Sequence, residues 1–385
     1  MPFFFLLLHR GQIPKSMKLI CKTLVAAALA VLACNPVKAQ QNMENVLTER
    51  QQCIVAISSL EAKGDIDGLK AAVNAGLDAG LTINQIKEAL SQLYAYTGFP
   101  RSLNALGALQ GVLEERGKKG IKDEEGRDAS PMADGYDALR QGTEVQTRLS
   151  GKPFNYTFAP ATDYYLKAHL FGDIFARDNL TFAQRELVTV SALAALEGCG
   201  SQLASHVNGA RNMGLSDAEI RSIPAVLAAR VGAVEAWRAR KAIAEVYGEE
   251  FTEGRPVSDP MFPQGQPNAA YAKYFIGESY LAPLSTGKVP VSNVTFEPRC
   301  RNNWHIHHGG IQVLICVGGT GWYQEWGKQA RPLKPGDVVE IPEGVKHWHG
   351  ATRDSWFQHV TFTVAGEGAS NEWLEPVTDE EYDKL

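Results

Sequence analysis

The chain has 385 residues and a mass of 42.0 kDa, a length that favours two or three domains over one. Hydrophobic residues make up 44% of it and charged residues 21%, so wholesale disorder and a coiled coil are both disfavoured. The formal net charge of −5 argues against a nucleic-acid-binding protein, which needs a concentrated basic face. No apolar run reaches the roughly 18 residues of a membrane-spanning helix.

The first 39 residues are typical of an export signal. Lys18 and Lys22 precede the apolar run 24–34, and the small residues after that run match the positions that a signal peptidase reads. We therefore expect residues 1–39 to be a signal peptide and the mature chain to be periplasmic or secreted. An alternative interpretation makes Cys34 the acylated cysteine of a lipoprotein.

Residues 45–116 and 137–248 form an internal repeat. Both copies carry residues that are typical of the first and last positions of α-helices. Both stretches contain a Ser or Thr followed three residues later by Gln or Glu, which is the pattern of a capping box. The four pairs are Thr48/Gln51, Thr82/Gln85, Thr181/Gln184 and Ser216/Glu219. Gly80 and Gly214 stand where a left-handed residue would end the preceding helix. Each copy is predicted to contain a helix, a short turn, a second helix, a glycine stop and a capped third helix, and the two copies to form an all-α layer.

Two linkers separate the predicted domains. Residues 117–136 are charged and broken by glycine, which predicts a solvated connection, and residues 249–270 contain four prolines, which cannot continue a helix. Short β-rich runs then predict a small antiparallel barrel or sandwich over residues 271–370, followed by a tail at 371–385. The runs are 292–297, 312–317, 321–326, 338–341 and 358–364.

A candidate metal site lies in this β region. Six of the nine histidines fall between positions 305 and 359. His305 and His307 are two residues apart, so both rings point to the same face of a strand, and Gln312 and His347 follow. Three imidazoles and an amide oxygen suit a divalent Mn, Fe, Ni, Cu or Zn ion and leave positions open for substrate or water. The alternative is a chance cluster of surface histidines in a turn-rich region.

This segment resembles the cupin family, whose first motif reads here His305-Ile-His-His-Gly-Gly-Ile-Gln312. The second motif contains His347 and has Ala351 in place of its final asparagine. Arg299 replaces the leading glycine of the first motif, and Gln312 replaces its glutamate. The resemblance implies a double-stranded β-helix barrel that binds a metal through His305, His307, Gln312 and His347. The set looks like that of small manganese cupins with hydroxynitrile lyase-type activity, which makes Mn the favoured ion.

The other histidines of the β region receive lesser roles. His349 lies on the same strand face as His347 and is expected to line the pocket or support a ligand. His308 and His359 are given no role, since an exposed histidine is the default.

The helical repeat resembles the carboxymuconolactone decarboxylase family. In the redox branch of that family a glutamate precedes a Cys-x2-Cys-x3-His motif. Here Cys199 and His206 match, Glu186 stands one residue off the glutamate spacing, and the second cysteine is Gln202. A dithiol cycle through the motif is therefore excluded, which favours the decarboxylase branch. The resemblance also implies a homo-oligomer, for which a trimer-based assembly is one option.

A proton-transfer site is predicted at His206, with Glu186 orienting its ring. Counted from a turn near residues 198–200, the two side chains are offset by about 8 Å along the helices, so a bend or a neighbouring subunit would have to close the gap. A packed helix residue is the alternative for His206. The matching positions of the first copy are Cys53 and Ala72, which cannot perform this chemistry, so that copy is expected to be scaffold and Cys53 a small buried residue. The disulfide state of the four cysteines beyond the signal is left open.

The sequence thus predicts an exported fusion of an all-α decarboxylase-like region with a metal-binding cupin barrel. The leading hypothesis is a lyase acting on small lactone, carboxylate or carbonyl substrates, with the metal polarising a substrate oxygen. Peroxide reduction through Cys199 is one alternative, and a non-enzymatic cupin that binds metal or ligand is another.

Overall fold

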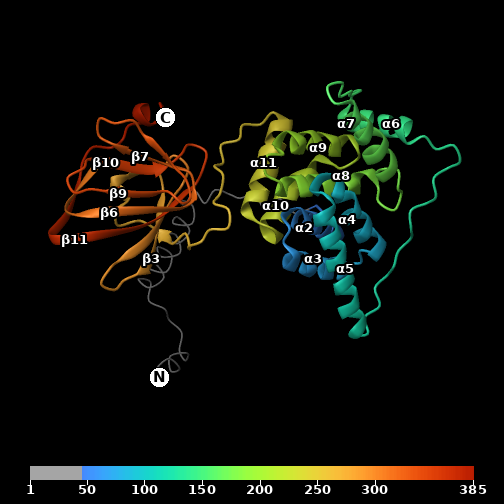
Figure 1. The fold of residues 1–385 in the computed structure, drawn as a ribbon, viewed down its shortest axis with the longest axis horizontal. Coiled ribbons are helices and arrows are strands. Elements are labelled where there is room, and N and C mark those ends of the chain that lie inside the picture. Colours follow the sequence, from blue (N-terminus) through green and yellow to red (C-terminus); the bar gives the residue numbers. More distant parts are fainter. Residues whose placement is uncertain (1–45) are drawn as a thin grey trace, which may run out of the picture. The chain divides into compact units, whose positions relative to one another are not determined.

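The computed structural model describes residues 46–385 (Figure 1). The signal peptide expected at residues 1–39, and Cys34 with it, lies outside the described residues. Within 46–385 none of the helices has the length and apolar character needed to cross a membrane.

Each copy of the helical repeat contains four α-helices, one more than the sequence pattern predicted. The first copy comprises α2 (Glu49–Lys63), α3 (Ile66–Asp78), α4 (Ile83–Thr97) and α5 (Phe99–Lys118). The second comprises α8 (Phe182–Ala195), α9 (Gly200–Asn212), α10 (Asp217–Arg230) and α11 (Ala233–Tyr247). The additional helices, α5 and α11, follow a glycine and have no side-chain hydrogen bond at their first turn, so the capping pattern did not reveal them.

The predicted capping boxes are confirmed. The side chain of each capping residue accepts the N–H of the residue three positions later, and the side chain of that later residue accepts the capping N–H in return. The capping residues are Thr48, Thr82, Thr181 and Ser216. Gly80 (φ 86°) and Gly214 (φ 110°) adopt the left-handed backbone that the stop positions require.

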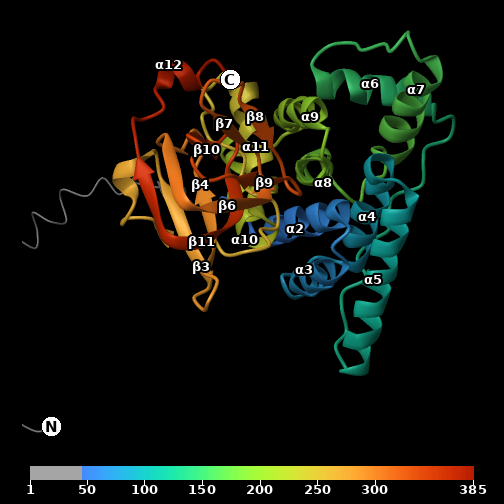
Figure 2. The same ribbon diagram turned by 60° about the vertical axis from the view of Figure 1, so that its left-hand side comes forward.

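One core of buried aliphatic side chains runs through both copies. Ile54 and Ile57 of α2 and Val188 and Ala192 of α8 all belong to it and are at most 4% exposed. α2 lies beside α8, so the first helix of each copy forms the centre of the layer (Figure 2). Burying these faces against each other is what stabilises helices whose individual propensity is modest.

The segment between the two copies is hydrogen-bonded to the first copy. The carbonyl oxygens of Glu124 and Glu125 accept the N–H groups of Ile83 and Asn84, the first two residues of α4. These contacts satisfy donors that a helix N-terminus leaves free. Residues 117–136 are nonetheless mostly exposed, as expected of a solvated connection, while the main chain of this stretch caps a helix.

A small helical insertion precedes the four repeated helices of the second copy and lies inside the bounds predicted for that copy, 137–248. It consists of α6 (Ala138–Ser150), α7 (Pro160–Tyr164) and the π-helix η1 (Tyr165–Ile174). Leu149, Phe171 and Phe175 form its apolar cluster, against which Tyr96 of the first copy packs. The insertion therefore brings first-copy side chains next to second-copy ones.

The C-terminal region folds into an antiparallel β barrel, as predicted. Its strands are β1 (Gln266–Pro267), β2 (Phe275–Ile276), β3 (Ser279–Ser285), β4 (Val291–Phe296), β5 (Arg301–Asn302), β6 (His305–Gly319), β7 (Gly321–Glu325), β8 (Arg331–Leu333), β9 (Val338–Ile341), β10 (His347–Ala351) and β11 (Phe357–Trp373), with a 3₁₀ turn η2 (Ala272–Tyr274). All five predicted β runs fall on β4, β6, β7, β9 and β11. In the sheet order β3-β4-β11-β6-β10, strand β6 lies centrally and pairs with β11, β10 and β9.

Residues 371–385 belong to the barrel, which corrects their prediction as a tail. β11 continues to Trp373, and α12 (Asp379–Tyr382) follows. Tyr382 is 1% exposed and packs with Trp348, and the Arg301 guanidinium donates to the carbonyl oxygen of Val377 at 2.8 Å. These contacts anchor the C-terminal segment on β5 and β10.

The four cysteines in the described residues, Cys53, Cys199, Cys300 and Cys316, are free thiols. Cys53 is fully buried, as expected of a small core residue. Burial raises the pKa of Cys316 to about 12, so that thiol stays protonated at neutral pH.

Glu61 on α2 makes the stability of the helical layer depend on pH. The side chain is 1% exposed; one carboxyl oxygen accepts the Thr97 hydroxyl at 2.8 Å, and the other has no partner. Burial raises the pKa of Glu61 from 4.5 to about 7. Because the folded pKa lies above the unfolded one, stability is full below the unfolded value of 4.5 and is lost as the pH rises through about 7.

We predict that Glu61→Gln stabilises the protein above pH 7 relative to wild type and has little effect near pH 5. The gain is at most about 3 kcal/mol, since one pKa unit corresponds to about 1.4 kcal/mol. Urea unfolding followed by the helical circular dichroism signal at pH 5 and pH 8 measures it. The same difference between variant and wild type at both pH values would contradict this account.

Candidate functional site

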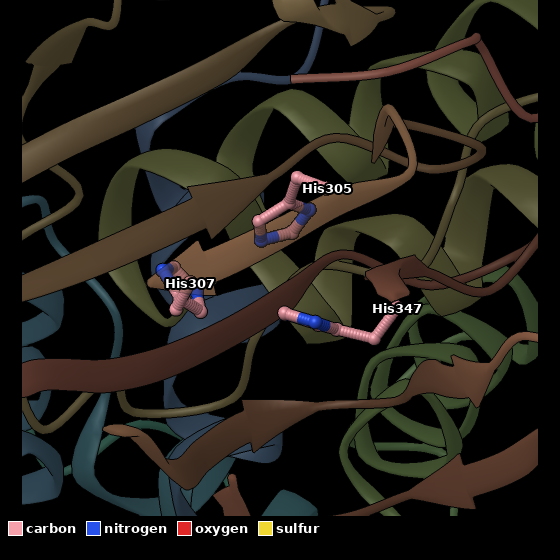
Figure 3. A group of neighbouring side chains, drawn as sticks. All are labelled: His305, His307 and His347. Carbon is pink, nitrogen blue, oxygen red and sulfur yellow. The ribbon is translucent and has the colours of Figure 1, made fainter. Parts of the chain in front are cut away.

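Three histidines approach one another inside the barrel from two neighbouring strands (Figure 3). His305 and His307 alternate with outward residues on β6, and His347 opens β10 directly opposite His305. All three are at most 4% exposed. One nitrogen of each ring lies within 4.8 Å of the others, so the predicted triad is brought together.

Hydrogen bonds at Nδ1 orient each ring. His305 Nδ1 bonds the carbonyl oxygen of Asn303 at 2.9 Å, and His347 Nδ1 bonds that of Val345 at 2.9 Å. His307 Nδ1 bonds the side-chain oxygen Oδ1 of Asn371 at 2.7 Å. A ring that donates from Nδ1 presents the lone pair of Nε2, which is the arrangement of a metal-ligating histidine.

Burial keeps His305 and His347 neutral. It holds the pKa of His305 well below its usual range, and it lowers the pKa of His347 to about 4. The buried Nε2 of His347 has no hydrogen-bond partner. Neutral rings with free lone pairs are the form that binds a cation.

Gln312 completes the candidate ligand set. Its Oε1 lies 2.9 Å from His307 Nε2. When Nδ1 of His307 donates to Asn371, Nε2 is an acceptor, as is Gln312 Oε1. Two acceptors at this spacing fit ligands of one cation. Three imidazole nitrogens and one amide oxygen therefore fit a divalent transition metal.

A cavity of about 420 Å³ adjoins the triad. Tyr271, Phe275, Phe296 and Trp373 contribute aromatic walls, and Trp373 stacks on His305 with ring centroids 4.7 Å apart. A cavity of this size and mixed character accepts a small organic molecule.

His349 and His359 line the same cavity. His349 Nε2 accepts a hydrogen bond from Asn302 Nδ2 at 3.0 Å, which places the proton on Nδ1, and Nδ1 has no partner. Neither nitrogen of His359 has one. Burial holds the pKa of His349 well below its usual range and lowers that of His359 to about 3.

The expectation that His359 is exposed is thus wrong, because β11 lies between β4 and β6 and His359 is 0% exposed. Its spacing of two residues from Thr361, another cavity residue, is the signal that could have found it. His308 is exposed, as expected, and pairs with Glu372.

Glu186 and His206 meet in the helical region. Glu186 Oε2 lies 2.8 Å from His206 Nδ1, Glu186 is fully buried, and the His206 side chain is 12% exposed. The expected offset of about 8 Å, to be closed by a bend or another subunit, is corrected: α8 ends at Ala195 and α9 begins at Gly200, so the offset is three residues, or about 4.5 Å, which a glutamate side chain spans.

Tyr96 and Cys199 are two further side chains in this region. The ring of Tyr96 meets that of His206 edge-on at 5.7 Å, so the first copy contributes to the site. Cys199 is half-buried and stands one residue before α9, seven residues ahead of His206. About 10 Å of helix thus separates the thiol from the imidazole.

Comparison with known families finds two matches. The model of the carboxymuconolactone decarboxylase family matches residues 37–111 and 160–245, and the cupin domain model matches residues 292–357. A cupin-type (R)-mandelonitrile lyase from Granulicella tundricola is 39% identical over 115 residues, which are 29% of this chain and 87% of that protein.

Two solved structures are similar to part of the chain. A cupin-like protein from Thermotoga maritima is 41% identical and covers 33% of this chain and 96% of its own, with a TM-score of 0.30. A DMSP lyase from Ruegeria pomeroyi is 16% identical and covers 38% of this chain and 69% of its own, with a TM-score of 0.24.

We predict that His305→Ala lowers the metal content of the purified protein by more than about tenfold, because one of few ligands is lost. The matched control is His308→Ala, which removes an exposed histidine three residues away on the same strand. Elemental analysis after purification without added metal measures both. Equal metal content in the two variants would show that the triad does not hold the ion.

Proposed function

Since this chain belongs to the carboxymuconolactone decarboxylase family in its helical region and to the cupin family in its C-terminal barrel, we propose that it is a lyase with a metal-dependent site in the barrel. The substrate class proposed for the barrel is small α-hydroxy compounds such as cyanohydrins, which are cleaved to a carbonyl compound. The relative named (R)-mandelonitrile lyase supports this class. Manganese is the ion proposed first, with Fe, Ni, Cu or Zn as alternatives.

One observation carries the proposal: two buried imidazoles with unpartnered nitrogens face the same cavity as the ligand set. A buried polar atom without a partner is costly, so such atoms are expected where a ligand supplies the missing contact. His359 has two such nitrogens and His349 one. Apolar rings surround them, because Phe296 contacts both.

These residues would divide the reaction as follows. His359 accepts the proton of the substrate hydroxyl; the bond between the hydroxyl-bearing carbon and the leaving carbon breaks, its electron pair departs with cyanide, and the oxygen becomes a carbonyl oxygen. The imidazolium of His359 then returns the proton to cyanide. His349 donates from Nδ1 to the departing anion and holds it in place. The bound ion, when present, supplies Lewis-acid polarisation of the substrate oxygen.

The ligand set favours this chemistry electrostatically. A histidine side chain binds a cation in its uncharged form, and the Gln312 amide carries no charge, so none of the four ligands offsets the charge of a divalent ion. Developing negative charge on the substrate oxygen is stabilised more strongly by such an ion than by one bound to a carboxylate.

We predict that the metal-loaded protein cleaves mandelonitrile and that His359→Gln lowers kcat by about 10²–10⁴-fold without lowering metal content, because a general base is lost. Appearance of benzaldehyde absorbance measures turnover, and elemental analysis measures the metal. The control is His308→Gln, which leaves turnover unchanged. Bound metal without turnover of cyanohydrins or of related hydroxy acids would instead support a binding module.

A second activity is proposed for the helical site, supported by the buried contact between Glu186 and His206. Loss of carbon dioxide from an unsaturated lactone acid leaves a carbanion that must take up a proton. His206 would deliver that proton from Nε2, and Glu186 would hold the ring through Nδ1.

We predict that His206→Gln lowers the rate of carbon dioxide release from a carboxylated lactone by at least about 10²-fold while cyanohydrin cleavage is unchanged. Release of carbon dioxide and cyanohydrin turnover are measured on the same preparations. If the variant releases carbon dioxide as fast as wild type, the dyad is structural. Peroxide consumption that is lost in Cys199→Ser would support the redox alternative.

Export and self-association are also proposed. The signal pattern at residues 1–39 supports export, with lipid attachment at Cys34 as the alternative. Phe99 and Leu103 on α5 are 61% and 62% exposed, and this apolar surface supports association with a second copy.

A further inference from the structure

The amide ligand of the barrel site has an orientation requirement that a carboxylate does not have. The two oxygens of a glutamate are equivalent, so either one binds a cation. The Gln312 side chain has one oxygen and one NH₂ group, and only the oxygen offers a lone pair. Rotating the amide by half a turn would point N–H donors at the ion and remove one ligand.

One hydrogen bond supports the orientation in which the oxygen faces the site. Gln312 Nε2 donates to Thr361 Oγ1 at 3.2 Å, and Oε1 then faces His307 Nε2 at 2.9 Å. In this orientation the Thr361 hydroxyl accepts from the NH₂ group, and the amide oxygen is left to face His307.

The register of the sheet explains why Thr361 is in reach. On β11 and β6, Thr363 lies directly opposite Gln312 and Thr361 opposite Leu314. Thr361 is therefore the diagonal neighbour of Gln312 on one face of the pair, a distance that a long side chain covers. Both threonines line the cavity, and among the described residues the Thr363 hydroxyl makes no hydrogen bond to Gln312.

We propose that Thr361 is a positioning residue that holds the carbonyl oxygen of Gln312 toward the metal, and that the glutamine-for-glutamate exchange makes this contact necessary. The inference rests on the proposed metal site and deepens it. Groups that orient a metal ligand typically contribute 10–100-fold to metal affinity.

Mn²⁺ binding to the full chain, stripped of metal by a chelator, tests the inference. Free Mn²⁺ is counted by its room-temperature paramagnetic resonance signal during a titration. Thr361→Val is expected to raise the Kd for Mn²⁺ by about 10–100-fold, because valine has the shape of threonine but cannot accept the amide N–H. Thr361→Ser, which restores the hydroxyl, is expected to bind within about threefold of wild type, and so is the neighbouring control Thr363→Val.

Repeating the measurement in the Gln312→Glu variant separates an orienting role of Thr361 from a role in packing. In Gln312→Glu the ligand has two oxygens, so adding Thr361→Val is expected to raise the Kd by less than about threefold. A tenfold or larger loss when Thr361→Val is added to Gln312→Glu would show that Thr361 acts through packing, and would overturn the inference. Thermal unfolding of each metal-free variant shows whether it is folded.

Two other outcomes of the titration distinguish a failure of the inference from a failure of the proposed metal site. If wild type binds Mn²⁺ and Thr361→Val binds it equally well, the inference fails and the proposed metal site stands. If wild type binds no Mn²⁺, the proposed metal-dependent function and the inference fail together.

Discussion

The barrel site depends on the hydrogen bonds that fix the Nδ1 atoms of its three buried histidines. Two of the acceptors are main-chain carbonyl oxygens, at Asn303 and Val345, each two residues before the histidine that it holds. The third is the side chain of Asn371, which comes from the far end of β11. Burial keeps His305 and His347 neutral, and the three hydrogen bonds decide which nitrogen of each ring faces the centre. Without these hydrogen bonds the same residues would be buried histidines whose ring nitrogens do not face a common point.

The cavity beside this centre contains a second polar layer. His349 and His359 present nitrogens that nothing in the described residues satisfies, inside a cavity whose walls mix aromatic, aliphatic and polar side chains. Such groups cost the folded protein stability, and a substrate with one hydroxyl and one leaving group offers partners for both. The arrangement separates the groups that would hold the ion from the groups that would move the proton.

The helical region shows how one copy of a repeat keeps a polar site while the other loses it. Glu186 and His206 meet on α8 and α9, whereas the matching positions in the first copy are Cys53 and Ala72. Cys53 instead lies 3.4 Å from Arg230, which also binds Glu49. The first copy is more than scaffold, however, because its Tyr96 packs on the ring of His206.

Much of the fold and most of the metal site followed from the sequence alone, because they rest on local spacing. Capping boxes act between residues three apart, and side chains two apart on a strand share a face, so the repeat, the main strands and the set from His305 to His347 were all predictable. The fourth helix of each copy was not, because no side chain caps it. Only the tertiary structure decided that His359 is buried, that Glu186 reaches His206, and that Thr361 holds Gln312. Each of these depends on which strands or helices lie side by side, and such pairings join residues too far apart in the chain for any local pattern to record.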